Sequence, residues 1–307
     1  MSENFPEYKK GILFAIGTAL CWAVLAILLK FALNFIDANS IVWVRMSVAT
    51  ILIGLSLSLK KISDLNFLFK APSSVYIAAL ALGFNYIGYM NCIELTTASN
   101  TQIMIQLGPL LLALFGILYF KEIPSRMQLI GFIFALIGFS FFFRDQLLIS
   151  WEYKDKYIKG NLWVIAAAIT WTYFTLVQKS QSAHHSPQKI LFVVFFYSSL
   201  FLTPFANFGS LLSLDIYQWA LLLLLGLNSW VAYAFLSEAL KRAPASHISL
   251  IIVLNPLLTI LTIQTLHRFN LLFIAFEPLN WTGYLGTALV ITGVALTVTF
   301  QKSKKIK

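Results

Sequence analysis

The chain has 307 residues, of which 59% are hydrophobic and only 11% are charged, and its mean hydropathy is +0.80. A soluble domain carries about 25% charged residues, so this composition excludes a water-soluble globular protein. The formal net charge of +10 does not indicate nucleic-acid binding, because the basic residues form short clusters between apolar runs, as in the cytoplasmic loops of membrane proteins.

Ten apolar segments are long enough to cross a bilayer, for which a helix needs about 20 mostly apolar residues. They cover residues 10–33, 39–59, 73–95, 98–120, 127–144, 159–180, 188–208, 216–240, 244–266 and 280–301. These segments have neither the length nor the alternation of barrel strands, and backbone groups in hydrocarbon must be satisfied internally. The predicted fold class is therefore all-α integral membrane, with ten transmembrane helices and no soluble domain.

The basic residues between the spans favour one set of alternating connections, which includes Lys9, Lys60, Lys121 and Lys241. Lys and Arg mark cytoplasmic loops, so both termini are predicted to lie in the cytoplasm. The connection 145–158 is the weakest point of this topology, because its basic residues are mixed with acidic ones. We expect a multi-pass protein of a bacterial inner (plasma) membrane.

A sequence similar to that of the first span recurs half-way along the chain. Gly11–Lys30 aligns without a gap with Gly160–Lys179, which places Trp22 on Trp171. Further aligned pairs are Tyr86 with Tyr233, Pro109 with Pro256, Glu122 with Glu277, Gly131 with Gly286 and Gly138 with Gly293. Each half has five predicted spans, an odd number, so the second half would enter the membrane inverted relative to the first. The domains are predicted as a first repeat at 1–145, an inter-repeat loop at 146–158 and a second repeat at 159–307.

The two five-helix halves, which open with Gly11 and Trp22 and with Gly160 and Trp171, resemble the EamA branch of the drug/metabolite transporter superfamily. Arg45 early in the second span, a proline in the fourth and ninth spans, and a Glu followed nine residues later by a Gly in each half add to the resemblance. It covers nearly the whole chain. The resemblance implies a ten-helix transporter of small organic solutes, often amino acids or related metabolites, and frequently an exporter.

Polar and aromatic side chains in the middle of a span are costly unless they face partners or a water-filled cavity. The candidates for a substrate cavity are Trp22, Asn85, Tyr86, Tyr89, Gln102, Gln106, Trp171, Asn228, Trp230, Tyr233, His247 and Asn255. Pro109 and Pro256 would free backbone carbonyls nearby for a ligand. The alternative for the tryptophans is helix packing, for the amides it is hydrogen bonding between helices, and for His247 it is solvation near the cytoplasmic face.

Arg45 lies about two turns into the second span, where it could pair with a carboxylate of the substrate or with Glu94. No Asp or Glu lies at mid-depth in any predicted span, so the usual carboxylate proton relay is missing. We therefore expect facilitated or weakly proton-linked exchange. Aromatic, amide and hydroxyl walls suit a zwitterionic or uncharged solute with an apolar part.

These features predict a secondary transporter that moves a small organic metabolite, an amino acid or derivative, by alternating access. The resemblance favours export, and it leaves open the uptake of a cofactor-like metabolite such as S-adenosylmethionine. The alternative from another class is a polytopic membrane enzyme, but the chain has no HExxH, no DxxD and no Ser–His–Asp cluster. We expect no cofactor, no metal and no nucleic acid; the expected partners are a small-molecule substrate and membrane lipids, for a monomer or homodimer.

Overall fold

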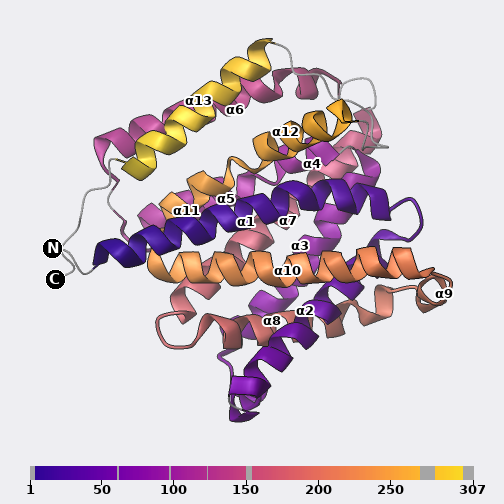
Figure 1. Ribbon diagram of the computed structural model, residues 1–307. Coiled ribbons are helices and arrows are strands. Elements are labelled where there is room, and N and C mark those ends of the chain that lie inside the picture. The colour runs from indigo at the N-terminus through magenta and orange to yellow at the C-terminus, as the bar shows by residue number, and fades with distance from the viewer. Residues whose placement is uncertain are drawn as a thin grey trace.

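The computed structural model of the protein describes residues 4–60, 62–96, 98–122, 124–149, 154–269 and 281–299. Every regular element within these ranges is a helix (Figure 1). In chain order the elements are α1 (Asn4–Ala32), α2 (Ala38–Lys60), η1 (Ile62–Phe69), α3 (Ser73–Leu95), α4 (Ala98–Met104), α5 (Leu107–Leu118), α6 (Arg126–Ile149), α7 (Lys154–Gln181), α8 (Pro187–Leu202), η2 (Thr203–Phe205), α9 (Phe208–Leu212), α10 (Ile216–Arg242), α11 (Ala245–Ile252), α12 (Asn255–Arg268) and α13 (Trp281–Thr299). The elements η1 and η2 are 3₁₀ helices.

Among the described residues, eight candidate spans are long and apolar enough to cross a membrane. They are Pro6–Ala32, Ala38–Leu59, Ser73–Leu95, Asn100–Leu118, Ile158–Gln181, Pro187–Phe205, Ile216–Arg242 and Ala245–Arg268. The fifth and tenth predicted spans correspond to α6 and α13, whose described apolar stretches are shorter, at Arg126–Gly138 and Tyr284–Gly293. The structure thus confirms an all-helical membrane protein, while the count of ten spans stays a prediction.

Two of the spans are interrupted near their middle. The fourth predicted span is divided into α4 and α5 by a turn at 105–106, and the ninth into α11 and α12 by a turn at 253–254. A proline follows each turn, Pro109 in α5 and Pro256 in α12. Proline has no backbone N–H and its ring clashes with the preceding helical turn. Both segments remain candidate spans, Asn100–Leu118 and Ala245–Arg268, but each consists of two helices and not of one.

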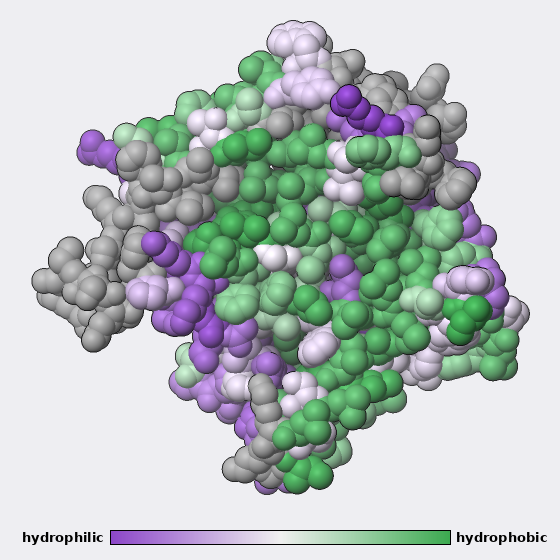
Figure 2. All heavy atoms as spheres, viewed as in Figure 1, coloured by the Kyte–Doolittle hydropathy of each residue, from purple (hydrophilic) through white to green (hydrophobic). Residues whose placement is uncertain are grey.

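The outer face of the bundle is apolar. Figure 2 shows a broad green belt, with the purple, hydrophilic residues gathered mainly toward its left and right ends. Large side chains such as Leu13, Leu20, Leu55 and Leu223 are half exposed or more. A soluble monomer rarely exposes such a continuous apolar surface, so this belt is suited to contact with lipid tails.

Helix α1 packs closely on α10, and α3 packs closely on α7. A Cβ atom added to Gly11 of α1 would lie 3.0 Å from the Cβ of Ala243, and one added to Gly160 of α7 would lie 2.7 Å from Cγ2 of Thr96. Small residues at such crossings let helix backbones approach each other. Gly11 and Gly160 are aligned positions of the two halves, so each half uses the same position for a close contact with the other half.

Helices α6 and α13 lie side by side (Figure 1) and meet through four glycines. A Cβ added to Gly138 of α6 would contact the carbonyl oxygen of Gly286, and one added to Gly293 of α13 would contact the carbonyl oxygen of Gly131. Gly131 and Gly138 align with Gly286 and Gly293, so the two contacts are reciprocal. Reciprocal contacts are what an approximate twofold relation between two halves produces.

Helix occupies much of the segment 146–158 that was predicted as an inter-repeat loop. Helix α6 continues to Ile149, and α7 begins at Lys154. Asp155 lies in the first turn of α7, where a negative charge is favourable because it complements the helix dipole. Glu277, the aligned partner of Glu122, lies outside the described residues.

We predict that Gly138→Ala will lower the free energy of unfolding by about 1–3 kcal/mol, because the added methyl group overlaps the α13 backbone. Thermal unfolding of the purified protein in detergent measures this change. Gly209→Ala is the control, because a Cβ there meets only the Asn207 side chain, at 3.3 Å. A Gly138→Ala variant as stable as the wild type would contradict the close packing of α6 on α13.

Candidate functional site

A cavity of about 70 Å³ lies inside the bundle, with walls from both halves of the chain. It is lined by Trp22, Leu25, Arg45, Asn85, Tyr86, Tyr89, Gln102, Ile105, Gln106, Pro109, Trp171, Tyr233, Ile252 and Asn255. A buried water needs about 10–15 Å³ of such volume, so the cavity has room for about five waters or for a small solute. The two interrupted spans contribute residues on both sides of their turns.

Aromatic rings form one wall of the cavity. Trp22 and Trp171 contact each other edge to face, with ring centroids 6.1 Å apart, and Trp22 contacts Tyr233 in the same way at 5.4 Å. Tyr86 lies beside Tyr233 at a centroid distance of 6.1 Å. Two aligned pairs, Trp22 with Trp171 and Tyr86 with Tyr233, therefore meet here. The tryptophans pack on each other and also line the cavity, and their contact with a solute stays a prediction.

Arg45 places a positive charge in the lining and is only 3% exposed. Its Nε donates to Ser229 Oγ at 3.1 Å, and its guanidinium carbon lies 4.4 Å from the centroid of the Tyr86 ring. Glu94 is exposed, and Arg45 forms no ion pair within the described ranges. The alternative in which Arg45 pairs with Glu94 is thus not realised. A buried charge is costly unless it is paired, so an anion bound in the cavity would stabilise Arg45.

Amide side chains border the cavity and also join helices. Asn85 Nδ2 donates to the Ala167 carbonyl at 2.9 Å, which ties α3 to α7. Gln106 Nε2 donates to the Gln102 carbonyl at 3.1 Å, across the turn that separates α4 from α5. Asn255 begins α12 at the equivalent interruption of the other half. The polar lining thus gathers at the two places where helices are interrupted.

Three of the predicted cavity residues lie elsewhere. Asn228 Nδ2 donates to the Cys21 carbonyl at 3.0 Å, so its geometry matches the alternative of hydrogen bonding between helices. Trp230 is partly buried against the apolar core, and His247 lies in a buried cluster at the end of the bundle where α1 begins. Helical periodicity places a side chain on a face but does not say which neighbour that face meets.

Sequence reasoning missed the apolar part of the lining. Leu25, Ile105 and Ile252 border the cavity, as does Pro109, which was considered only for its effect on the backbone. Apolar residues fill every span of this chain, so their type carries no signal. The only available hint was their position next to polar residues, as Ile105 stands beside Gln106.

Glu122, in the connection between α5 and α6, caps the N-terminus of α11. Its Oε1 accepts from the Ala245 N–H at 2.8 Å, and its Oε2 accepts from the N–H and the hydroxyl of Ser246 at 3.1 and 2.7 Å. Lys179 Nζ lies 3.2 Å from Oε1 and donates to the Ala243 carbonyl at 3.1 Å. The carboxylate satisfies N–H groups that have no partner inside the helix and complements the helix dipole. We call this arrangement the Glu122 cap.

The carboxyl group of the Glu122 cap is ionised at neutral pH. Burial alone would raise its pKa, but the charge of Lys179 and the hydrogen bonds from Ser246 and Ala245 outweigh burial, so the pKa lies below its ordinary value of 4.5. The repeat alignment singled out Glu122 without giving it a role. Its partners are distant in sequence, and no local signal could have identified them.

A buried histidine cluster lies next to the Glu122 cap. The Tyr8 hydroxyl of α1 lies 2.9 Å from His247 Nδ1, and Gln128 of α6 contacts Nε2 of the same ring. His247 is 4% exposed, so the alternative of simple solvation is wrong. Three helices, α1, α6 and α11, are therefore joined through one imidazole.

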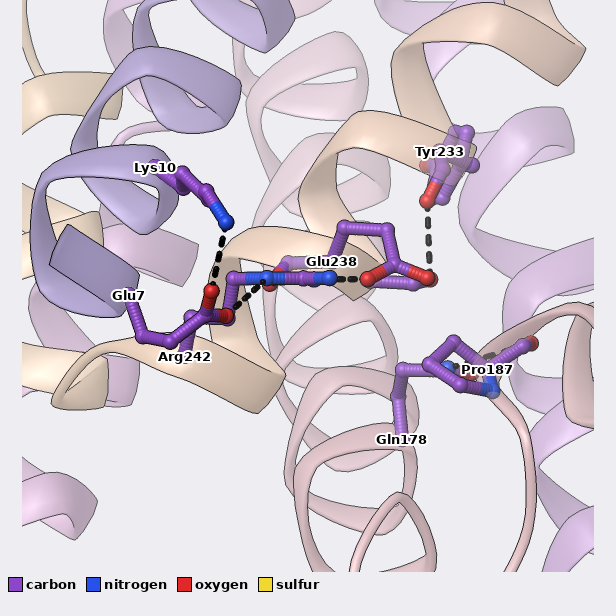
Figure 3. Close-up of polar contacts among 8 residues, drawn as sticks. Glu7, Lys10, Gln178, Pro187, Tyr233, Glu238 and Arg242 are labelled. Carbon is purple, nitrogen blue, oxygen red and sulfur yellow. Dashed lines mark hydrogen bonds and ion pairs between the residues drawn. The ribbon is translucent and has the colours of Figure 1, made fainter. Parts of the chain in front are cut away.

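An ion cluster joins α1 to α10 at the same end of the bundle. Figure 3 shows Arg242 between Glu7 and Glu238, with Lys10 also contacting Glu7. Arg242 Nε lies 3.0 Å from Glu7 Oε2. With the Glu122 cap and the histidine cluster, these pairs hold the bundle together where α1 begins.

Comparison with known proteins identifies the family. Residues 9–144 and 158–299 match the EamA-like transporter family. The chain belongs to this family. It is 30% identical over 286 residues to YhbE, an uncharacterized inner membrane transporter of Escherichia coli (strain K12), and covers 89% of that protein with 92% of its own length. An uncharacterized transporter of Haemophilus influenzae is 28% identical over 293 residues, 95% of each chain.

A solved crystal structure resembles the fold, with a TM-score of 0.71 at 16% identity, over 94% of this chain and 96% of the other. A likeness at this identity supports the fold alone. The family membership and the helical spans together establish a multi-pass membrane transporter, and not an enzyme.

The Glu122 cap predicts a pH-dependent stability. Because folding lowers the pKa of Glu122, its contribution is fully present above the ordinary value of 4.5 and is lost as pH falls through the lower folded value. We expect Glu122→Gln to be about 1–3 kcal/mol less stable than the wild type at neutral pH, with a difference that shrinks below pH 4.5. Thermal unfolding in detergent over a pH series measures both quantities.

The control for this prediction is Glu94→Gln, which removes an exposed carboxylate that has no ion pair within the described part of the chain. A Glu122→Gln deficit of the same size at every pH would contradict an ionised cap.

Proposed function

We propose that the protein moves a small organic metabolite, an amino acid or a close derivative, across a bacterial inner membrane by alternating access through the central cavity. Ten spans, arranged as two inverted five-helix repeats with both termini in the cytoplasm, would form the transport path. The inner-membrane location is supported by the similarity to the Escherichia coli transporter and by the distribution of Lys and Arg.

The observation that carries the proposal is the buried guanidinium of Arg45 in a cavity without an acidic lining residue. A desolvated cation that lacks a carboxylate partner gains most from a ligand that supplies one. The aromatic wall formed by Trp22, Trp171 and Tyr233 offers a complementary surface for an apolar side chain. A carboxylate beside an apolar group describes most amino acids.

The reciprocal contacts between the halves support the inverted repeat. Trp22 contacts its aligned partner Trp171, and Tyr86 contacts Tyr233. Positions that are equivalent in two repeats meet each other only near the axis that relates them. Such an axis would pass through the cavity, which is where inverted-repeat transporters bind their solute.

Rocking of the two halves would open and close the cavity alternately toward each face. The Glu122 cap, the histidine cluster and the Arg242 pairs would then be the closed inner gate of this conformation, because all three lie where α1 begins. Export is the direction that the family resemblance favours. Opening this gate requires these polar contacts to be exchanged for contacts with water.

The alternative is uptake of a larger, cofactor-like metabolite such as S-adenosylmethionine, for which the aromatic wall would provide a stacking surface. A cavity of about 70 Å³ would have to expand to hold such a solute. One experiment distinguishes the two proposed functions. It is an uptake and efflux screen with a metabolite mixture in cells that overproduce the protein.

We predict that Arg45→Met will weaken transport of a carboxylate-bearing solute, raising its apparent KM about 10- to 100-fold, because a charge-assisted hydrogen bond is lost. Counterflow of the solute found in the screen, into proteoliposomes that contain the purified protein, measures this change. Arg126→Met is the matched control, because Arg126 is exposed at the start of α6. Unchanged transport by folded Arg45→Met would contradict the role of this guanidinium.

A further inference from the structure

Two amide oxygens at the interrupted spans lack hydrogen-bond partners among the described residues. Gln106 is 1% exposed and Asn255 is 4% exposed, and both line the cavity. The side-chain carbonyl oxygens of both have no partner. For Gln106 the amide orientation is fixed, because its Nε2 donates to the Gln102 carbonyl at 3.1 Å. The free group of Gln106 is therefore an acceptor.

A second void offers little to the free oxygen of Gln106. This void of about 10 Å³ lies beside the cavity, bordered by Gln106 and otherwise by apolar side chains of α5, α6, α11 and the turn that follows α11. A buried water needs about 10–15 Å³ and two to four polar partners, and Gln106 is the one polar residue among those described that borders this void. A donor therefore reaches Gln106 from the main cavity, where a solute group can replace water.

A free oxygen is not sufficient evidence by itself. Gln178 and Asn228 also have side-chain carbonyl oxygens without partners, but neither residue lines the cavity. Gln106 and Asn255 differ because they occur together, one at each helix interruption, in the same cavity as Arg45, which has no acidic partner among the described residues. A buried acceptor pair and a buried cation are complementary to opposite ends of a zwitterion.

We propose that the side-chain carbonyl oxygens of Gln106 and Asn255 bind the primary ammonium group of the transported solute. This inference rests on the proposed function, in which Arg45 receives the carboxylate. An ammonium group has three donors and no acceptor, and it matches two amide acceptors that no described side chain or backbone group satisfies. Carbonyl sites for alkali cations use rings of oxygens that replace the hydration shell, which two amides do not provide.

The consequence is selectivity for the amino group. A 2-oxo acid with the same side chain keeps the carboxylate but leaves both acceptors unpaired, and an N-acetyl derivative replaces the ammonium group with a bulky amide. A site that is built to bond a donor discriminates strongly against an analogue that lacks it. The carrier would therefore take free amino acids in preference to both analogues.

The test measures thermal stabilisation of the purified full-length protein, in sodium-free buffer, by the protein amino acids, the matching 2-oxo acids and the N-acetyl derivatives, each alone. We expect at least one amino acid to bind about tenfold or more tightly than its 2-oxo acid. Gln106→Met should remove this preference while the affinity for the 2-oxo acid stays unchanged. Gln178→Met is the control for replacing a buried glutamine, and it should keep the preference.

Equal binding of an amino acid and its 2-oxo acid, both weakened by Arg45→Met, would overturn this inference and leave the proposed function standing. A preference that appears only with added sodium would overturn it in favour of an ion site. If no carboxylate of either kind binds or is transported, the proposed function fails as well. Should Gln106→Met not fold, Asn255→Leu and the wild-type comparison of the two ligands decide the question.

Discussion

An interrupted helix inside an apolar bundle exposes polar groups that lipid cannot satisfy, and the arrangement of this protein follows from that constraint. The turns between α4 and α5 and between α11 and α12 lie where a proline prevents a continuous helix. Irregular backbone at such depth is tolerated only where it is buried in protein or lines a cavity. Both turns border the same cavity here, so the polar groups at the two interruptions share one site inside the bundle.

The interrupted spans also explain why residues of the first half form polar contacts with residues of the second half. The short helix α11 begins at the end of the bundle, where its N–H groups need acceptors, and Glu122 from the other half supplies them, supported by Lys179. The bond between Tyr8 and His247 joins the same two halves. Contacts that cross between repeats, and not within one, are those that a rocking motion must break. In the proposed mechanism, the Glu122 cap and the Tyr8–His247 contact would therefore have to open with the inner gate.

The sequence predicted the helical membrane class and much of the cavity lining, because apolar length and polar residues in mid-span are strong local signals. The inverted repeat stays a prediction. It did not show that Gln106 lines the cavity whereas Asn228 does not. Both residues are amides on membrane helices, and only their neighbours in three dimensions differ. The sequence offered Arg45 two possible partners, Glu94 and a carboxylate of the substrate. Glu94 is exposed and does not pair with Arg45 in the described part of the chain. The sequence predicted that His247 would line the cavity or meet solvent, but a long-range contact with Tyr8 buries it elsewhere. Partners far apart in the chain leave no trace in a single sequence.

The central claim is that one cavity is reached alternately from the two faces of the membrane. Cysteine accessibility tests it most directly, with Ile252→Cys as the reporter in a chain whose Cys21 and Cys92 are replaced by serine. In oriented vesicles, a membrane-impermeant thiol reagent should modify this position from either side, and the transported solute should slow the reaction from both. Modification from one side alone, unaffected by the solute, would contradict the account.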